Sequence, residues 1–299
     1  MSIFVTHNRM ALGRPTGYIL DRIEGAVIAY SLRKLTATGN KCLQLYNSSG
    51  SSTNILFNSA GGLNESDFET HCTGGVLTGL GRARRFYNQL DEDSHELITP
   101  GDYAYIYDYS GEGLYDGLEY NNLTGQLVAN SFYSVSNHAS FQFDEDSSFT
   151  SYVRFNCIDT GAQSGTGALF CKGIDLGAFG HALRVDVNPY PPKLRSGVRA
   201  ADGTARYATS DTIDKNVYIS AIMTYSSRTI KNYMNGVQWG SDIDVETGET
   251  FGTTTPLRSI GNGHAFVGSA APYAKVRLQE AVMFNRVLTA SEITLLSAS

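Results

Sequence analysis

The sequence predicts an all-β protein, an antiparallel β-sandwich with an N-terminal arm and a few short helices. Apolar runs of strand length follow one another about ten residues apart, and Gly, Ser, Thr and Asn fill the turns between them. Helical crossover segments are too few for a parallel sheet. Hydrophobic residues make up 41% and charged residues 17% of the 299-residue chain, which is a globular composition. We therefore expect one large sandwich or two modest domains.

The first 20 residues are expected to form an arm outside the sandwich. Ile3, Phe4 and Val5 are apolar, Arg9 follows a polar break, and Gly and Pro residues punctuate the remainder. Such a segment is either a frayed terminus or docks on a neighbouring subunit. If it docks, these four residues are the expected anchors.

Strands are expected where short apolar or tyrosine-rich runs alternate with a period of two. The sharpest local signal is Asn235-Gly236 between two such runs, the preferred sequence of a type I′ hairpin turn. Thr289 and Glu292 have the spacing of a capping box and predict a closing helix over 289–296. We also expect helices over 64–72 and 76–90, and a surface connection over 114–130. The expected strands cover 26–35, 42–46, 55–57, 103–109, 149–157, 168–171, 182–187, 217–225, 229–234, 237–239, 265–267 and 275–284.

The charge of the chain argues against nucleic acid as a partner. Its net charge is −6 and its isoelectric point is about 5.5, whereas binding to a phosphate backbone needs a basic face. No run approaches the roughly 20 apolar residues of a membrane span. Residues 1–14 lack the apolar centre of a signal peptide, so we expect synthesis in the cytoplasm.

The chain is expected to bind no cofactor and no metal ion. Its four cysteines are widely spaced and match no zinc pattern, so reduced and buried thiols are expected. A disulfide between Cys157 and Cys171 stays open, because they lie at the ends of adjacent strand candidates. The acidic run 144–146 is compatible with a calcium-binding loop, but a solvated acidic turn explains it better. The cysteines are Cys42, Cys72, Cys157 and Cys171.

Carboxylates in or beside strand candidates are the possible catalytic groups. A retaining glycosidase needs two of them about 5 Å apart. A strand-edge or surface-paired carboxylate is the better explanation for each. Glu280 is the strongest candidate, because in a regular strand it shares a face with Leu278 and Val282. The candidates are Asp108, Glu112, Asp186 and Glu280.

Aromatic side chains are the candidates for stacking on a sugar. Tyr107, Asp108, Tyr109 and Trp239 are the residues that we expect to contact a ligand. Tyrosines at alternate strand positions also suit a half-buried sheet face, and that alternative stays open.

Residues 131–299 resemble the jelly roll of laminin-G-like and concanavalin A-like domains. Ser131 to Val135 and Phe149 to Phe155 are similar to the opening strands of that family. Ile219 to Tyr225 followed by Ile230 to Val237 is similar to its central hairpin, and Leu278 to Ile293 to its closing strand and short helix. The resemblance implies a fold and does not by itself imply an activity.

Residues 25–113 resemble the amino half of the α-L-arabinofuranosidase B catalytic domain, as found in virion proteins of tailed phages. The resemblance rests on the segment from Gly25 to Leu35 and on Tyr107-Asp-Tyr-Ser-Gly-Glu-Gly113. Where that family has an Asp-Asn turn before its closing strand, this chain has Gly268-Ser-Ala-Ala-Pro272, which removes a catalytic acid. We expect 1–20 to be an arm, and 21–130 to supply strands to the same sandwich as 131–299.

These resemblances lead us to expect a non-enzymatic structural protein of a bacteriophage particle, as a capsid decoration or a tail or fibre component. The expected partners are other virion proteins, further copies of the chain in a homo-oligomer such as a trimer, and a host-surface polysaccharide. The alternatives are a carbohydrate-binding module and a glycoside hydrolase of the arabinofuranosidase type.

Overall fold

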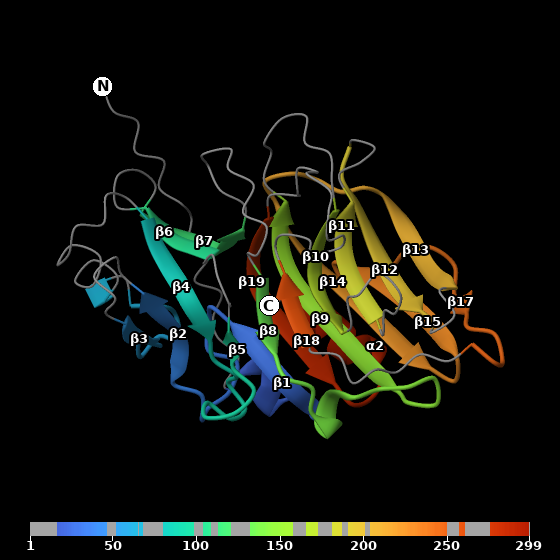
Figure 1. Cartoon of the computed structure of the whole chain (residues 1–299), viewed down its shortest axis with the longest axis horizontal. Coiled ribbons are helices and arrows are strands. Elements are labelled where there is room, and N and C mark those ends of the chain that lie inside the picture. Colours follow the sequence, from blue (N-terminus) through green and yellow to red (C-terminus); the bar gives the residue numbers. More distant parts are fainter. Residues whose placement is uncertain are drawn as a thin grey trace.

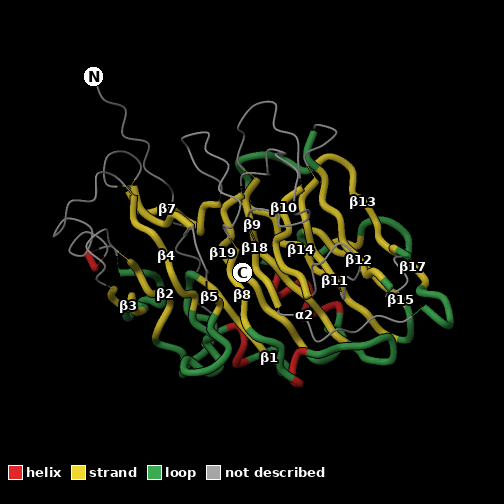
Figure 2. The backbone as a smooth tube through the Cα atoms, viewed as in Figure 1, coloured by secondary structure: helices red, strands yellow, loops and turns green. Residues whose placement is uncertain are grey.

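The computed structural model is an antiparallel β structure in which strands make up most of the described chain (Figures 1 and 2). The expected fold class is therefore confirmed. None of the helices in the described part of the chain is long and apolar enough to cross a bilayer. The structure describes residues 17–46, 52–64, 66–67, 80–98, 104–108, 113–120, 132–157, 166–172, 181–186, 191–200, 204–249, 257–260 and 276–298.

The strands form two packed layers and a side sheet that is paired with both. The first layer has the order β1 (Ala26–Ser31), β19 (Val276–Phe284), β9 (Phe149–Cys157), β14 (Tyr218–Ser226) and β15 (Thr229–Met234), with β16 (Val237–Gln238) and β17 (Ile243–Asp244) both on β15. The second layer has the order β5 (Leu97–Ile98), β8 (Phe132–Val135), β18 (Leu257–Ile260), β10 (Thr166–Lys172), β11 (His181–Asp186), β12 (Lys193–Arg199) and β13 (Ala205–Thr212).

The side sheet comes from the amino-terminal part of the chain. Its order is β3 (Ser52–Leu56), β2 (Lys41–Tyr46), β4 (Leu80–Phe86), β6 (Ala104–Asp108) and β7 (Gly113–Tyr120). β7 pairs with β19 of the first layer, and β4 pairs with β5, which leads into the second layer. The strands β1, β5 and β7 therefore share backbone hydrogen bonds with strands from the carboxyl-terminal part of the chain.

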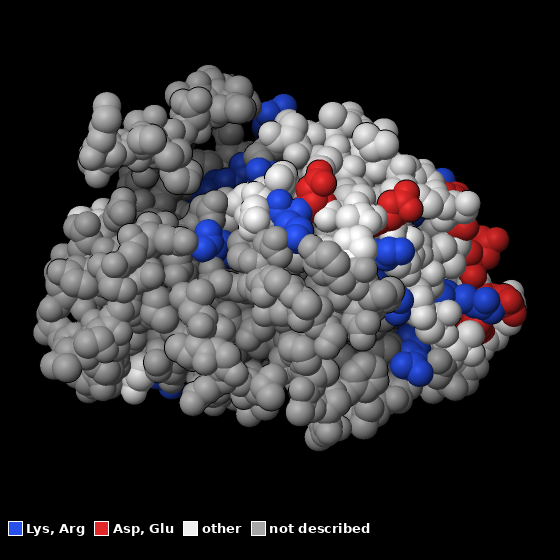
Figure 3. All heavy atoms as spheres, turned by 90° about the horizontal axis from the view of Figure 1, so that it is seen from above, with Lys and Arg blue, Asp and Glu red and all other residues white. Residues whose placement is uncertain are grey.

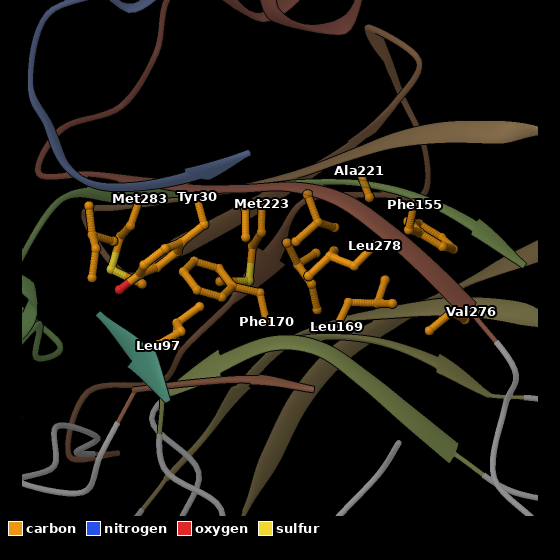
Figure 4. Close-up of a cluster of buried hydrophobic side chains, with 14 of the residues drawn as sticks. Tyr30, Leu97, Phe155, Leu169, Phe170, Ala221, Met223, Val276, Leu278 and Met283 are labelled. Atoms are coloured by element: carbon orange, nitrogen blue, oxygen red, sulfur yellow. The ribbon is translucent and has the colours of Figure 1, made fainter. Parts of the chain in front are cut away.

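The main hydrophobic core fills the space between the two layers (Figure 4). Tyr30, Met223 and Met283 approach from the first layer and meet Leu97 and Phe170 from the second. All five side chains are fully buried. Burial of side chains of this size contributes about 1.5–3 kcal/mol each, so this contact between layers dominates the stability of the fold.

A second hydrophobic core covers the other face of the first layer. There α2 (Ala290–Ser297) and the short 3-10 helix η1 (Ile19–Asp21) pack on the sheet. Eight of the nine residues of β9 are buried as a result. The residues of this second core are Leu20, Ile23, Ala29, Leu35, Tyr152, Ile222, Val282, Phe284, Leu288, Ile293 and Leu296.

The closing helix is confirmed together with its capping box. The Thr289 side chain accepts a hydrogen bond from the Glu292 amide at 3.3 Å, and the Glu292 carboxylate accepts one from the Thr289 amide at 2.8 Å. Arg286 donates two hydrogen bonds to the same carboxylate, at 2.9 and 2.6 Å, and these lower the pKa of Glu292 to about 2. The helix therefore begins at a fixed point directly after β19.

The hairpin turn at Asn235-Gly236 is also confirmed, since both residues have positive φ, 51° and 82°. The expected helix over 76–90 is wrong, because Leu80–Phe86 is strand β4 and hydrogen-bonds to β2 and β6. The expected surface connection over 114–130 is wrong as far as residue 120, where β7 ends. The expected strand 265–267 lies outside the described residues, as does most of the expected helix 64–72.

Among the described residues, the segment after β4 hydrogen-bonds to the free edge of β1 through side chains and through the Gln89 backbone amide, which donates to the Ala29 carbonyl at 2.8 Å. Asn88 accepts a hydrogen bond from the Ala29 amide at 3.0 Å. The Gln89 amide group donates to the Ser31 and Arg33 carbonyls at 3.0 and 2.9 Å, and its oxygen accepts from the Leu35 amide at 2.7 Å. These contacts join the segment after β4 to the edge of the sandwich, where unpaired backbone groups would be costly.

Candidate functional site

The structure does not bring the expected ligand-binding residues together. The backbones of Tyr107 and Asp108 lie in β6, whereas Tyr109 is outside the described residues. Trp239 follows β16 and hydrogen-bonds through its amide to the Asn232 carbonyl of β15 at 2.9 Å. β6 and β15 lie at opposite ends of the molecule (Figure 1). The expected anchors Ile3, Phe4, Val5 and Arg9 fall outside the described part of the chain.

The Trp239 side chain packs against the main hydrophobic core. It is half-buried against the main core, and its indole nitrogen is buried without a hydrogen-bond partner. An indole in this position contributes packing area to the core.

Glu280, the strongest catalytic candidate, lies inside a network of hydrogen bonds. A β-bulge at Gln279 separates it from Leu278, so Leu278 faces the main core while Val282 faces the second core. The expectation that Glu280 shares a face with both is therefore wrong. It is fully buried on the side of the sheet that α2 and η1 cover.

Donor groups occupy both oxygens of the Glu280 carboxylate. Arg33 donates from Nε to Oε1 and from Nη2 to Oε2, the latter at 3.0 Å. The Tyr152 hydroxyl donates to Oε2, also at 3.0 Å. Burial, followed by the charge of Glu280, raises the pKa of Tyr152. Burial by itself would lower the pKa of Arg33, but the charge and the hydrogen bonds of Glu280 outweigh it, so the pKa of Arg33 is also raised. The network pairs the Glu280 carboxylate with the Arg33 guanidinium and the Tyr152 hydroxyl inside the fold.

The structure describes some of the other candidate acids and three of the four cysteines. The backbone of Asp186 lies at the end of β11, and Glu112 is outside the described residues. Asp144 forms a local turn in which its carboxylate accepts from Ser147 at 2.6 Å. Within the described ranges no group of three or more His, Cys, Asp or Glu side chains is arranged to hold a metal ion. Cys42, Cys157 and Cys171 are buried free thiols.

The exposed side of the second layer carries an aromatic group that the sequence analysis missed. Tyr207 on β13 is 46% exposed, and it is the one aromatic residue among the exposed large hydrophobic side chains of the described chain. It stands opposite Gly197 of β12. A Cβ at Gly197 would come within 2.5 Å of the Tyr207 Cβ and 2.2 Å of the Arg206 carbonyl oxygen. The glycine therefore lets Tyr207 lie close against the sheet.

Arg195 completes this arrangement. Its guanidinium carbon lies 4.5 Å from the centre of the Tyr207 ring, within the range of a cation–π contact. Its Nε donates to the Thr209 hydroxyl at 3.2 Å. We refer to Arg195, Gly197, Tyr207 and Thr209 as the β12–β13 platform. It offers a half-exposed aromatic ring with a cation held beside it.

The platform was missed because neither of its strands was predicted. In β13, Tyr207 is the one large apolar residue at an exposed position, and the other exposed positions carry small or polar residues. In β12 a basic residue or glycine occupies every second position. Recognition of these alternating positions as the exposed face of a strand pair would have identified Tyr207.

Charges of both signs are exposed on the side of the molecule seen in Figure 3. Among the described residues, Lys and Arg side chains extend across the middle of this view, and acidic side chains lie among basic ones toward the right. The negative net charge therefore does not preclude local basic surfaces.

A family model described as the concanavalin A-like lectin/glucanases superfamily matches residues 129–294, more than half of the chain. No curated protein sequence matches the chain.

The chain is similar in fold to solved structures of glycosidases. A GH54 α-L-arabinofuranosidase variant soaked with 4-nitrophenyl α-L-arabinofuranoside superposes with a TM-score of 0.57 at 15% identity, over 91% of this chain and 62% of that one. A Trypanosoma rangeli sialidase in complex with 2,3-difluorosialic acid gives a TM-score of 0.51 at 16% identity, over 82% of this chain and 42% of that one. This chain spans less than two thirds of the length of either protein. Both suspected resemblances are confirmed at the level of the fold, and the chain belongs to the concanavalin A-like lectin/glucanase superfamily.

Proposed function

We propose that this chain is a non-catalytic glycan-binding β-sandwich, and that the β12–β13 platform binds the sugar. The observation that carries the proposal is the half-exposed Tyr207 ring, positioned by Gly197 and Arg195. Sugar rings present flat patches of C–H groups that pack on an aromatic face, and their hydroxyls accept hydrogen bonds from a guanidinium. The fold is one that lectins also use, which supports the proposal by analogy.

A glycan-binding assay with matched variants tests this proposal. We expect Tyr207→Ala to weaken binding to a host-surface polysaccharide by about tenfold, equivalent to about 1.4 kcal/mol. Val237→Ala is the matched control, because Val237 is 70% exposed but lies in the β15–β16 hairpin of the other layer. Isothermal titration after a glycan-array screen measures the effect. Unchanged binding by Tyr207→Ala, or no binding of any glycan by the wild type, would contradict the proposal.

The proposal that the chain is not an enzyme is supported by the surroundings of Glu280. A carboxylate nucleophile needs a free oxygen facing the substrate and a second carboxylate about 5 Å away. Both oxygens of Glu280 accept hydrogen bonds from Arg33 and Tyr152 inside the fold. We expect no release of 4-nitrophenol from 4-nitrophenyl α-L-arabinofuranoside. Turnover that Glu280→Gln abolishes would establish the hydrolase alternative.

We further propose that the sandwich is displayed on a bacteriophage particle and assembles there as a homo-oligomer such as a trimer. Residues Ile3, Phe4, Val5 and Arg9 are the proposed anchors to other virion proteins. Ordering such an arm costs about 1–2 kcal/mol per residue, which contacts with a partner have to offset. Deletion of residues 2–17 should therefore reduce incorporation into particles. Normal incorporation of the shortened chain would contradict the proposed anchoring role of these residues.

A further inference from the structure

We infer that His95 and His138 form an acid-sensitive contact, which holds the connection between β8 and β9 against the segment that leads into β5. The connection contains the short 3-10 helix η2 (Ala139–Phe141), and His138 is its N-cap residue. The other segment, 91–96, runs directly into β5. β5 pairs with β4 of the side sheet and with β8 of the second layer, so the contact lies near the place where these two sheets meet (Figure 1).

The two imidazole rings pack against each other and against a core aromatic residue. Their ring centroids are 4.4 Å apart, and their planes are inclined by 61°. Phe141 of η2 is fully buried in the main core, and its ring lies 5.3 Å from that of His95 at an angle of 86°. The histidine pair therefore adjoins the side chain that anchors η2 in the core.

The hydrogen bonds of His138 require a neutral ring. Its Nδ1 accepts a hydrogen bond from the Ser140 backbone amide at 3.2 Å, and a backbone amide can only donate. Nδ1 therefore carries no proton, and the proton of the neutral ring is on Nε2. A second proton would go to Nδ1, where the Ser140 hydroxyl at 2.8 Å can accept from it, but the amide would lose its acceptor. Protonation of His138 therefore removes the cap of η2.

His95 is held in the opposite tautomer. The Ser94 hydroxyl donates its single proton to the Asp91 carboxylate at 2.6 Å, so it accepts from Nδ1 of His95 at 3.1 Å. A second proton on His95 would go to Nε2. Protonation of both histidines would place two positive charges on adjoining rings, where they repel each other.

The surroundings of His95 favour its neutral form. Burial is the main cause of its lowered pKa, the charge of His138 is the second, and Asp91 opposes them only in part. From β1, the neutral Tyr30 hydroxyl donates to the His95 carbonyl. Among the described residues, the titratable group that faces His95 from η2 is thus another histidine. The other carboxylates of segment 91–96 are paired elsewhere, Glu92 and Asp93 with Lys41, and Glu96 with Arg85.

Mild acid should therefore open this contact before it unfolds the remainder of the chain. Histidine is the side chain that ordinarily changes its charge between pH 5 and 8. Above about pH 6.5 the contact has its full strength, and it weakens as the pH falls through the folded-state pKa of His95, because the open form binds protons more readily. Opening separates η2 from segment 91–96, whereas the pairing of β9, β14 and β15 does not involve either histidine.

Hydrogen exchange of the full chain at pH 7.5 and pH 5.5, followed by mass spectrometry, tests this inference. After correction for intrinsic exchange rates, peptides covering 91–98 and 136–142 should lose protection by at least about fivefold at pH 5.5; uptake of one proton on opening permits up to a tenfold change per pH unit. Residues 218–234 of the β14–β15 hairpin contain no His, Asp or Glu and provide the internal reference, whose protection should not change. An equal loss in the reference hairpin, or no loss in the two segments, would overturn the inference.

Asparagine variants show whether the two histidines are responsible. At position 138 the Asn side-chain oxygen can still cap η2, and at position 95 Asn tolerates the local φ of 57°. The double variant His95→Asn/His138→Asn should keep its protection at pH 7.5 and change by less than about twofold at pH 5.5. Asp91→Asn is the matched control, because it removes the carboxylate that acts on His95 and leaves both rings in place. A response to pH that persists in the double variant, or that disappears in Asp91→Asn, would refute the assignment to the histidine pair.

Discussion

Replacement of Glu280 by Gln removes the negative charge from the most buried ion pair of the described chain. The Glu280 side chain is fully buried, and that of Arg33 is 33% exposed. Removing one partner from a fully buried pair costs about 3–5 kcal/mol, because the other charge remains without compensation. Arg33 can recover part of its hydration, and Gln still accepts a hydrogen bond from Tyr152. We therefore expect Glu280→Gln to lower the free energy of unfolding by about 2–3 kcal/mol.

Urea unfolding at pH 7 measures this loss, and two further variants show where it comes from. Tyr152→Phe should cost about 1–1.5 kcal/mol, the contribution of one hydrogen bond to a charged group. Asp242→Asn is the control, since Lys231 and Asp242 are 45% and 43% exposed and should contribute less than about 0.5 kcal/mol.

A double-mutant cycle with Arg33→Met decides whether the ion pair is responsible. Once Glu280 is neutral, Arg33 has little left to lose, so the double variant should be more stable than the sum of the single effects by about 1–2 kcal/mol. Additive effects would refute the reasoning. So would a loss for Glu280→Gln no larger than that for Asp242→Asn.

Three other perturbations follow from the structure. Burial, followed by the charge of His138, lowers the pKa of His95. The contribution of His95 to stability is therefore complete above about pH 6.5 and is lost as the pH falls through the pKa of His95 in the folded state. His95→Asn, which tolerates the local φ of 57°, should reduce the difference in urea midpoint between pH 7.5 and pH 5.5. Gly197→Ala forces a methyl group against Tyr207, so it should lower the free energy of unfolding by about 1–3 kcal/mol and weaken glycan binding. A variant with wild-type glycan affinity and wild-type melting temperature would contradict the close contact between Gly197 and Tyr207. Thr289→Ala removes the helix cap and should cost about 1 kcal/mol in chemical denaturation, whereas Ser291→Ala in the first turn should cost less.

Turn and cap chemistry could be predicted most accurately from the sequence. Asn235-Gly236 and the Thr289–Glu292 pair act through their own backbone, so their local sequence is sufficient. Strands with apolar or aromatic residues, such as Phe149–Cys157 and Thr229–Met234, were also found within a residue of their bounds. Local signals fail where pairing with distant strands decides the structure. Leu80–Phe86 has four arginine or glycine positions that weaken any pattern, and its pairing with β2 and β6 makes it a strand.

The geometry of Glu280 could not be predicted for a related reason. A single extra residue at Gln279 reverses the direction of every later side chain in β19. Strict alternation places Glu280 with Leu278, whereas the bulge places it with Val282 beneath α2 and beside Arg33, which lies 247 positions away in the chain. No pattern within the closing strand reveals either the bulge or its partner.

The two layers of the sandwich differ in whether their outer faces are covered. The first layer has apolar cores on both sides, because η1 and α2 cover the face that the second layer leaves open. This explains why β9 and β14 are buried almost without interruption and do not alternate. In the second layer, Arg195, Tyr207 and Thr209 on the outer side remain partly or fully accessible. The strands β12 and β13 therefore offer an exposed sheet face on the second layer, and this face carries the half-exposed ring of Tyr207.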